Sequence, residues 1–271
     1  MRHPQFAAHA ASALASALTS ALILLAPDTL FAQKQDPKKW SGSAEASGTF
    51  LYGDANQRVA SMTATLQRAD NSALYKFEAQ AGYGDSRKTG ADRRGVVVRN
   101  MRLGTAIDLR RRDRISPYTF ATAASSLQQR YTSRVDAGAG ARITIWKPDT
   151  VRNGFPEEAT FSASVLGEQT RPIATPTVPR DDITRIRWSF RASYRKRLSP
   201  SLRISHVTLY QPSVIEASRL TLEVTTVVSA PLYARTELTV THRERIDSEA
   251  VERGAPSRRD GQVLFGVRTT F

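Results

Sequence analysis

The chain has 271 residues, no cysteine, 39 Lys and Arg against 25 Asp and Glu, and a formal net charge of +14. Its length allows one large domain or two small ones. The lack of cysteine excludes a disulfide framework and a cysteine-bound zinc site.

The first 32 residues are predicted to be a signal peptide. Arg2 and His3 precede a small and apolar stretch from residue 11 to 26, and Ala32 offers a small residue for cleavage before Gln33. Residues 33–38 would then be a short periplasmic segment, and a β-barrel would occupy residues 39–271. After Ala32 no apolar run approaches the roughly 20 residues of a spanning helix, and the mean hydropathy is -0.38. The mature chain is therefore soluble or a barrel, whose strands look polar on average because only alternate residues face lipid.

Alternation with a period of two recurs in about twelve segments, each near the roughly 9 to 11 residues of a tilted membrane-spanning strand. Trp40, Phe50 and Tyr52 place aromatic side chains at both ends of one face of the first segment. The eighth segment, 185–195, alternates apolar and aromatic residues with arginine and serine. In chain order the segments are 40–52, 58–66, 75–83, 97–109, 118–124, 135–145, 159–167, 185–195, 202–210, 220–230, 232–240 and 263–271.

Two of these segments fit less well. Pro117 interrupts the alternation just before 118–124. The segment 202–210 places His206 among apolar positions, so its register is expected to be shifted.

The connections alternate between short and long, as in bacterial outer-membrane barrels with short periplasmic turns and longer external loops. With the N-terminus in the periplasm, the predicted external loops are 53–57, 85–94, 126–130, 168–182, 211–217 and 243–259. The predicted periplasmic turns are 69–72, 111–114, 147–156, 199–200 and the region around Ala230 and Pro231. The stretch 147–156 is long for a turn, and it is the one place where the predicted topology leaves room for further structure.

The chain ends on an alternating strand closed by Phe271. Outer-membrane barrels commonly end in this way, and Phe271 is predicted to be part of the signal that the barrel-assembly machinery reads. Together with Trp40-Ser-Gly42, Gly53-Asp-Ala-Asn56 and Asp136-Ala-Gly138-Ala-Gly140, the chain resembles the YdiY-like salt-induced outer-membrane proteins over most of residues 38–271. Gly53-Asp54 stands where that family tends to have Gly-Asn. The resemblance implies an outer-membrane β-barrel and carries no catalytic residues.

Enzyme signatures are almost absent, and we predict no catalytic site, no metal site and no cofactor. The mature chain has two histidines, His206 and His242, and neither has metal-ligand spacing. Gly138 and Gly140 lack the third glycine of a dinucleotide motif, so close strand packing explains them better. A lipid-modifying barrel enzyme that uses His206 with Ser205, or His242 with a threonine, is the catalytic alternative.

Alternation predicts which charged side chains face the barrel interior. Seven arginines should form a lumen-facing basic wall: Arg102, Arg142, Arg185, Arg187, Arg191, Arg195 and Arg203. The acidic residues predicted to face inward are Glu45, Glu78, Asp108, Asp136, Glu223 and Glu237. A dry lumen requires these charges to pair and gives a filled barrel, whereas a wet lumen favours anions.

Basic residues also gather in the predicted external loops, where guanidinium groups could bind lipopolysaccharide phosphates. They are Arg87, Lys88, Arg93, Arg94, Arg171, Arg180, Arg253, Arg258 and Arg259. A solvated loop without a ligand explains them equally well. Nucleic-acid binding is not expected, because the charges are spread over alternating strands.

The sequence thus predicts an all-β protein, an antiparallel transmembrane β-barrel of about twelve strands in the outer membrane of a diderm bacterium. We expect a monomer with a structural or narrow-pore role, in contact with outer-membrane lipid and lipopolysaccharide. A soluble periplasmic β-sandwich or lipocalin-like barrel is the non-enzymatic alternative. It predicts that the apolar faces meet inside and that the arginines lie outside.

Overall fold

The computed structural model describes residues 40–51, 55–70, 72–88, 94–109, 114–146, 151–152, 155–174 and 181–271. All of them belong to one compact unit, residues 37–271. The predicted signal peptide, the segment 33–38 and the Gly53-Asp54 turn lie outside the described residues. No helix in the described part of the chain is long and apolar enough to cross a membrane.

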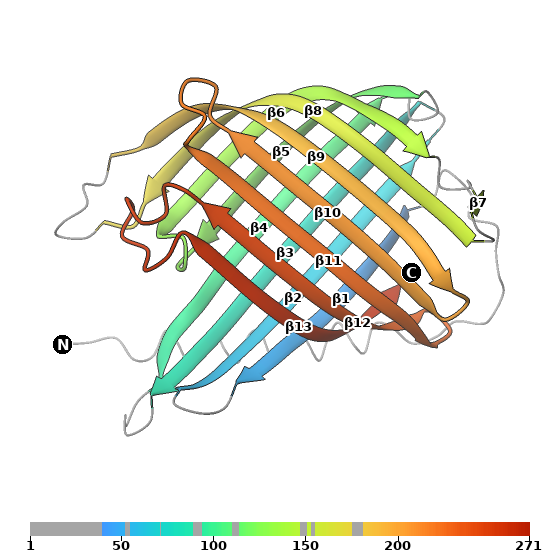
Figure 1. Ribbon diagram of the computed structural model, residues 1–271, viewed down its shortest axis with the longest axis horizontal. Helices are drawn as coiled ribbons and strands as arrows, with labels where there is room; N and C mark the ends of the chain where they lie inside the picture. The colour runs from blue at the N-terminus through green and yellow to red at the C-terminus, as the bar shows by residue number, and fades with distance from the viewer. Residues whose placement is uncertain are drawn as a thin grey trace. The chain divides into compact units, whose positions relative to one another are not determined.

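The described chain forms an antiparallel β-barrel (Figure 1). Each strand pairs with its neighbours in the sequence, and pairing of β1 with β13 closes the wall. The short β7 pairs with the first residues of β8, while β6 pairs directly with β8, so twelve strands build the wall. The strands are β1 (Trp40–Leu51), β2 (Ala55–Ala69), β3 (Ala73–Lys88), β4 (Gly95–Leu109), β5 (Ile115–Ser126), β6 (Tyr131–Trp146), β7 (Val151–Arg152), β8 (Phe155–Pro172), β9 (Ile183–Ser199), β10 (Leu202–Pro212), β11 (Leu220–Tyr233), β12 (Thr236–Asp247) and β13 (Arg259–Thr270).

The outer surface of the barrel is apolar and the inner surface is polar. Phe50, Trp188 and Phe265 are 64%, 45% and 63% exposed on the outside, whereas Arg187 is fully buried inside. Because successive side chains of a strand point to opposite faces, the alternation read from the sequence places the polar set in the lumen. This arrangement contradicts the soluble alternative, in which the apolar faces would meet inside.

The two ends of the barrel differ in their connections. We call the end with residues 70–72, 110–114, 147–154, 200–201 and 234–235 the turn end, and the end with residues 89–94, 127–130, 173–182, 213–219 and 248–258 the loop end. The longer connections lie mostly at the loop end, as predicted, although 127–130 is short and 147–154 at the turn end is long. The small β7–β8 hairpin lies within the long stretch 147–156, so that stretch adds no strand to the wall.

Several predicted boundaries were wrong because the strands run farther than the apolar alternation suggested. The predicted loops 168–182 and 243–259 begin inside β8 and β12, which continue to Pro172 and Asp247. The turn between β11 and β12 lies at Ala234 and Arg235, and Ala234 adopts a positive φ of 42°. Pro231 remains in β11 opposite Glu237, with a register shift just after it. The missed ends of β8 and β12 carry mostly polar and charged residues in place of the apolar ones on which the predicted boundaries were based.

The two weaker segments are regular strands. β5 runs through Pro117, which pairs with Ala141 of β6. β10 keeps a regular register from Arg203 to Tyr210, so the predicted shift at His206 was wrong. The two ring nitrogens of His206 lie 2.9 Å from the Thr226 and Thr208 hydroxyl oxygens, which satisfies a polar group on an otherwise apolar face.

The closing seam between β1 and β13 ends on Phe271. The backbone N–H of Gly42 donates to the Phe271 carbonyl at 2.9 Å, and the Phe271 N–H donates back at 3.0 Å. A Cβ at Gly42 would lie 2.7 Å from the Phe271 ring, so the missing side chain makes room for that ring.

We expect Phe271→Ala to reduce the amount of inserted barrel several-fold, because the substitution removes both the ring over Gly42 and the predicted assembly signal. Quantitative blotting of outer-membrane fractions measures this. Phe50→Ala removes another exposed aromatic side chain, from the opposite strand of the seam, β1, and should leave the amount nearly unchanged. Equal losses in the two variants would contradict a special role for the terminal residue.

Candidate functional site

The interior of the barrel carries the candidate site. Of the seven arginines predicted for the lumen, five have a carboxylate within 3.1 Å: Arg102, Arg142, Arg185, Arg187 and Arg203. Arg195 reaches Glu158 only at 3.9 Å, and Arg191 is exposed with no ion pair among the described residues. The structure therefore divides the predicted basic wall into a neutralised part and a free part.

An ion pair crosses the middle of the lumen. Arg102 on β4 donates to Glu223 on β11 at 3.1 Å, and five strands separate β4 from β11 in either direction around the wall. Arg245 of β12 approaches the other oxygen of Glu223 at 3.3 Å. Because a 12-stranded barrel is intermediate between filled and open barrels, side chains that meet across it narrow the passage at this level.

A second contact across the lumen centres on Asp247, the last residue of β12. Arg134 of β6 approaches its carboxylate at 3.2 Å and Arg253 at 2.6 Å. Asp247 is fully buried and both arginines are nearly so. Arg253 also donates to the Gln129 carbonyl at 3.1 Å, which ties the 127–130 and 248–258 loops together.

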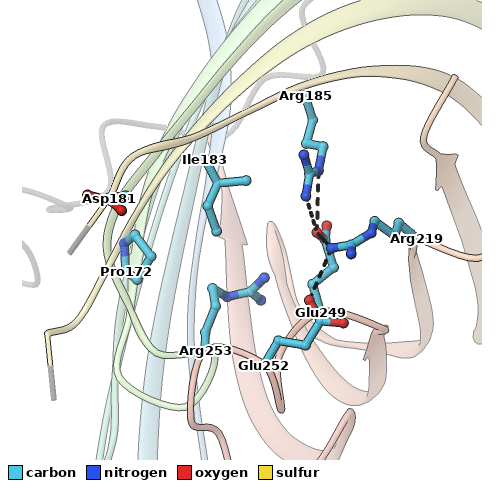
Figure 2. A pocket seen from close by; sticks show the side chains of 8 residues that line it. All are labelled: Pro172, Asp181, Ile183, Arg185, Arg219, Glu249, Glu252 and Arg253. Carbon is cyan, nitrogen blue, oxygen red and sulfur yellow. Dashed lines mark hydrogen bonds and ion pairs between the residues drawn. The ribbon is translucent and has the colours of Figure 1, made fainter. Parts of the chain in front are cut away.

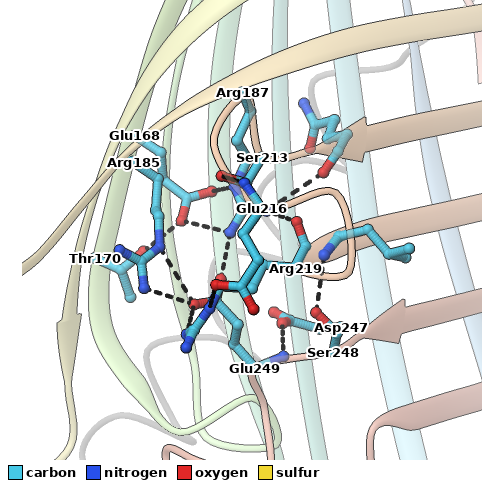
Figure 3. A network of polar contacts seen from close by, with 12 residues as sticks. Glu168, Thr170, Arg185, Arg187, Ser213, Glu216, Arg219, Asp247, Ser248 and Glu249 are labelled. Carbon is cyan, nitrogen blue, oxygen red and sulfur yellow. Dashed lines mark hydrogen bonds and ion pairs between the residues drawn. The ribbon is translucent and has the colours of Figure 1, made fainter.

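Glu249 links the 248–258 loop to the wall (Figure 3). One of its oxygens accepts from Arg185 at 3.0 Å and from Arg219 at 2.9 Å, and the other accepts from Arg187 at 2.6 Å. Arg187 also donates to Glu168 at 3.1 Å and to the backbone carbonyls of Gln211 and Arg219. All its nitrogens are engaged, which a buried guanidinium requires to offset its desolvation.

A pocket of about 240 Å³ lies beside this contact at the loop end (Figure 2). Arg185, Arg219 and Glu249 line it together with Glu252, Arg253, Pro172, Asp181 and Ile183. Two of its arginines point at Glu249, as Figure 2 shows, and Arg253 is bound to Asp247. The positive charges of this pocket are thus already neutralised by the protein.

The contact at Glu249 has a defined pH dependence. Burial alone would raise the pKa of Glu249, but hydrogen bonds from Arg219, Arg185 and Arg187 outweigh it and hold the pKa below its ordinary value. A carboxyl with a lowered folded pKa stabilises the structure above its unfolded pKa and loses that contribution as the pH falls through the folded pKa.

We therefore expect the loop to stay in place from neutral pH down to the ordinary glutamate pKa of about 4.3 and to be released only at lower pH. Conductance of the barrel in planar bilayers, recorded at a series of pH values from neutral to acid, measures this release. An increase between pH 7 and 5 would contradict the assignment to Glu249.

The basic residues predicted to bind lipopolysaccharide differ in their surroundings. Arg93 and Arg180 lie outside the described residues, and Lys88 ends β3. Arg94, Arg171 and Arg259 make ion pairs with Asp85, Asp182 and Glu244. Arg87 and Arg258 are exposed. Arg253, in contrast, is 2% exposed and bound to Asp247, so its prediction as a surface contact was wrong.

Sequence reasoning missed the residues that complete this network: Arg134, Glu168, Arg245, Asp247 and Glu249. The alternation itself continues through Arg243, Arg245 and Asp247, all on the inner face of β12. That signal could have extended the strand. Nothing in the sequence indicates that the 248–258 loop folds back over the opening.

Residues 44–271 match the family described as "Protein of unknown function, DUF481". The chain belongs to this family. The match confirms the resemblance to the YdiY-like proteins, whose family this is. None of the curated proteins matches the chain in sequence.

Solved structures of outer-membrane proteins are similar to this chain at very low identity and with TM-scores below 0.5. The COG4313 outer membrane channel from Pseudomonas putida F1 is 7% identical, with a TM-score of 0.47 over 90% of this chain and 99% of the channel. The translocator domain of the autotransporter NalP from Neisseria meningitidis is 9% identical, with a TM-score of 0.44 over 98% and 96%. The outer membrane channel DcaP of Acinetobacter baumannii is 7% identical, with a TM-score of 0.38 over 89% and 100%.

Proposed function

We propose that this DUF481 protein is an outer-membrane barrel of a diderm bacterium that acts as a narrow, anion-favouring pore, closed at its loop end, and has no catalytic role. The observation that carries the proposal is the division of the lumen arginines. Those at the loop end are paired with carboxylates of the wall and of the 248–258 loop. Toward the turn end, Arg195 reaches Glu158 only at 3.9 Å and Arg197 has no partner among the described residues.

The surface of the barrel supports a membrane location. Large apolar side chains are exposed on the outside of the wall, and lipid tails are the environment that would cover them. The longer connections lie at one end, which we assign to the cell exterior. Lipopolysaccharide is the proposed ligand of the exposed Arg87 and Arg258, and the barrel-assembly machinery is the proposed partner during insertion of a monomer.

The arrangement of charges supports a narrow pore. A wall that carries unpaired guanidinium groups attracts anions and repels cations. Contacts across the lumen, such as Arg102 with Glu223, restrict the passage to small solutes.

Conductance of the purified protein in planar bilayers under a salt gradient tests the proposal. We expect small, infrequent openings, because the 248–258 loop holds the loop end closed most of the time, with a reversal potential biased toward anions. Cation-biased reversal would overturn the anion preference, and a silent bilayer, after correct folding has been verified by heat-modifiable gel migration, would overturn the pore.

The non-catalytic part of the proposal has its own test. Both ring nitrogens of His206 are engaged by threonine hydroxyls, which does not favour a free general base. We expect His206→Ala and His242→Ala to leave phospholipid and lipid A profiles of the host unchanged. A modified lipid that disappears in either variant would establish the enzyme alternative.

A further inference from the structure

Three arginines meet on the inner wall at the turn end of β9 and β10. Arg195 and Arg197 occupy successive inward positions of β9, and Arg203 of β10 is the direct cross-strand partner of Arg197. Side chains at directly opposed positions have Cβ atoms about 5 Å apart, and like charges there repel one another. This cluster is therefore electrostatically unfavourable unless negative charge lies close to it.

A bulge creates this juxtaposition. The register between β9 and β10 shifts between Leu202 and Arg203, so that Leu202 pairs with Ser199 and Arg203 with Arg197, and Leu198 is left over. A β-bulge re-aims a side chain and is often found next to a functional site.

The charges of the cluster are incompletely neutralised. Arg203 contacts Glu237 at 2.5 Å, whereas Arg195 reaches Glu158 only at 3.9 Å and is 65% exposed. Arg197 makes no hydrogen bond or ion pair with any described residue, and its Nε is buried without a partner. Because no carboxylate among the described residues neutralises Arg197, its guanidinium lacks the negative charge that a bound anion would supply.

We infer that Arg195, Arg197 and Arg203 form a binding site for a compact multivalent oxyanion at the turn-end mouth of the lumen. Guanidinium forks match the oxygen geometry of phosphate groups. The ligand must compete with Glu158 and Glu237, which favours an anion with more than one charge over chloride. Arg191 lies two inward positions farther along β9 and offers the next free guanidinium toward the centre of the barrel.

This inference deepens the proposed anion-favouring lumen by locating its recognition element away from the loop-end arginines. The site can be tested separately from the pore, because anion binding can be measured without a conductance experiment. Isothermal titration calorimetry of the folded barrel in a zwitterionic detergent, with inorganic pyrophosphate as the probe, gives the affinity. Succinate in a second titration distinguishes phosphate chemistry from carboxylate chemistry.

We expect saturable pyrophosphate binding that weakens at least tenfold in the double variant Arg195→Gln/Arg197→Gln. The matched control, Arg68→Gln/Arg99→Gln, removes the same charge from exposed positions of β2 and β4 and should change the affinity less than twofold. Heat-modifiable migration verifies that both variants fold. If the glutamine variant does not fold, Arg195→Lys/Arg197→Lys, which keeps the charge but removes the guanidinium groups, takes its place.

The outcomes separate the two proposals. Absence of saturable binding to the parent protein, or equal weakening in the control, would overturn the site even if the barrel conducts anions. Binding that depends on Arg195 and Arg197 in a barrel that stays silent in bilayers would support the site and overturn the pore.

Discussion

Glu249→Gln is expected to raise the open probability of the barrel in planar bilayers at least tenfold. The substitution keeps the shape of the side chain but removes the charge that binds Arg185, Arg187 and Arg219 at 2.6 to 3.0 Å. Breaking a buried ion pair by removal of one partner costs about 3 to 5 kcal/mol, and each 1.4 kcal/mol changes an equilibrium about tenfold. The substitution destabilises the closed conformation of the 248–258 loop relative to the open one, so the open conformation becomes more populated.

The control for this experiment lies three residues away. Glu252 approaches Arg219 at 3.0 Å but is 56% exposed, so solvent screens its charge. Glu252→Gln should therefore leave the conductance within about twofold of the parent protein, as expected for an exposed pair worth about 1 kcal/mol or less. If Glu249→Gln and Glu252→Gln conduct alike, the loop is not held closed by the buried contact.

Gly140→Ala is expected to lower the free energy of unfolding by about 3 kcal/mol, the upper part of the range for overpacking. A Cβ at Gly140 would lie 2.1 Å from the Ala163 carbonyl oxygen and 2.5 Å from the Ser164 Cβ, so the backbone itself would have to move. The neighbouring Gly138 is covered by the ring of Phe120. Tyr118, stacked on Phe120, donates to the Ser164 hydroxyl at 2.9 Å. Because Gly138 and Gly140 have no side chains, β5, β6 and β8 can pack closely at this point.

Urea titration in lipid vesicles, followed by heat-modifiable gel migration, measures this loss. Gly167→Ala on β8 is the matched control, because a Cβ there meets no atom within 4 Å. Its midpoint should differ little from that of the parent protein. A stable Gly140→Ala variant would show that the inner wall yields more easily than these contacts suggest.

The two largest effects arise from different halves of the same lumen. Glu249 lies where ion pairs close the interior. Gly140 lies where residues without side chains allow neighbouring strands and their aromatic side chains to pack closely. The free guanidinium groups near the turn end belong to neither part. A ligand is the simplest source of the negative charge that they lack.

The sequence by itself determined the class of fold, the approximate strand count and the face on which each charged side chain lies. Successive side chains of a strand point to opposite faces, and each strand of the barrel separates an apolar environment from a polar one. Every strand segment therefore shows the alternation in its own sequence. Arg102, Arg187 and Glu223 were assigned to the lumen on this basis, and the structure places all three there.

Only the tertiary structure decided which charges meet. Arg102 and Glu223 are 121 residues apart and come together because the barrel closes β4 opposite β11. Glu249 lies in a loop whose sequence is typical of a solvated external segment, and the energy that draws it inward comes from three arginines on other elements. Pairing across a lumen depends on strand order, tilt and loop path together, and none of these is encoded within a single segment. The alternating pattern therefore fixes the direction of a side chain, whereas the closed wall selects its partner.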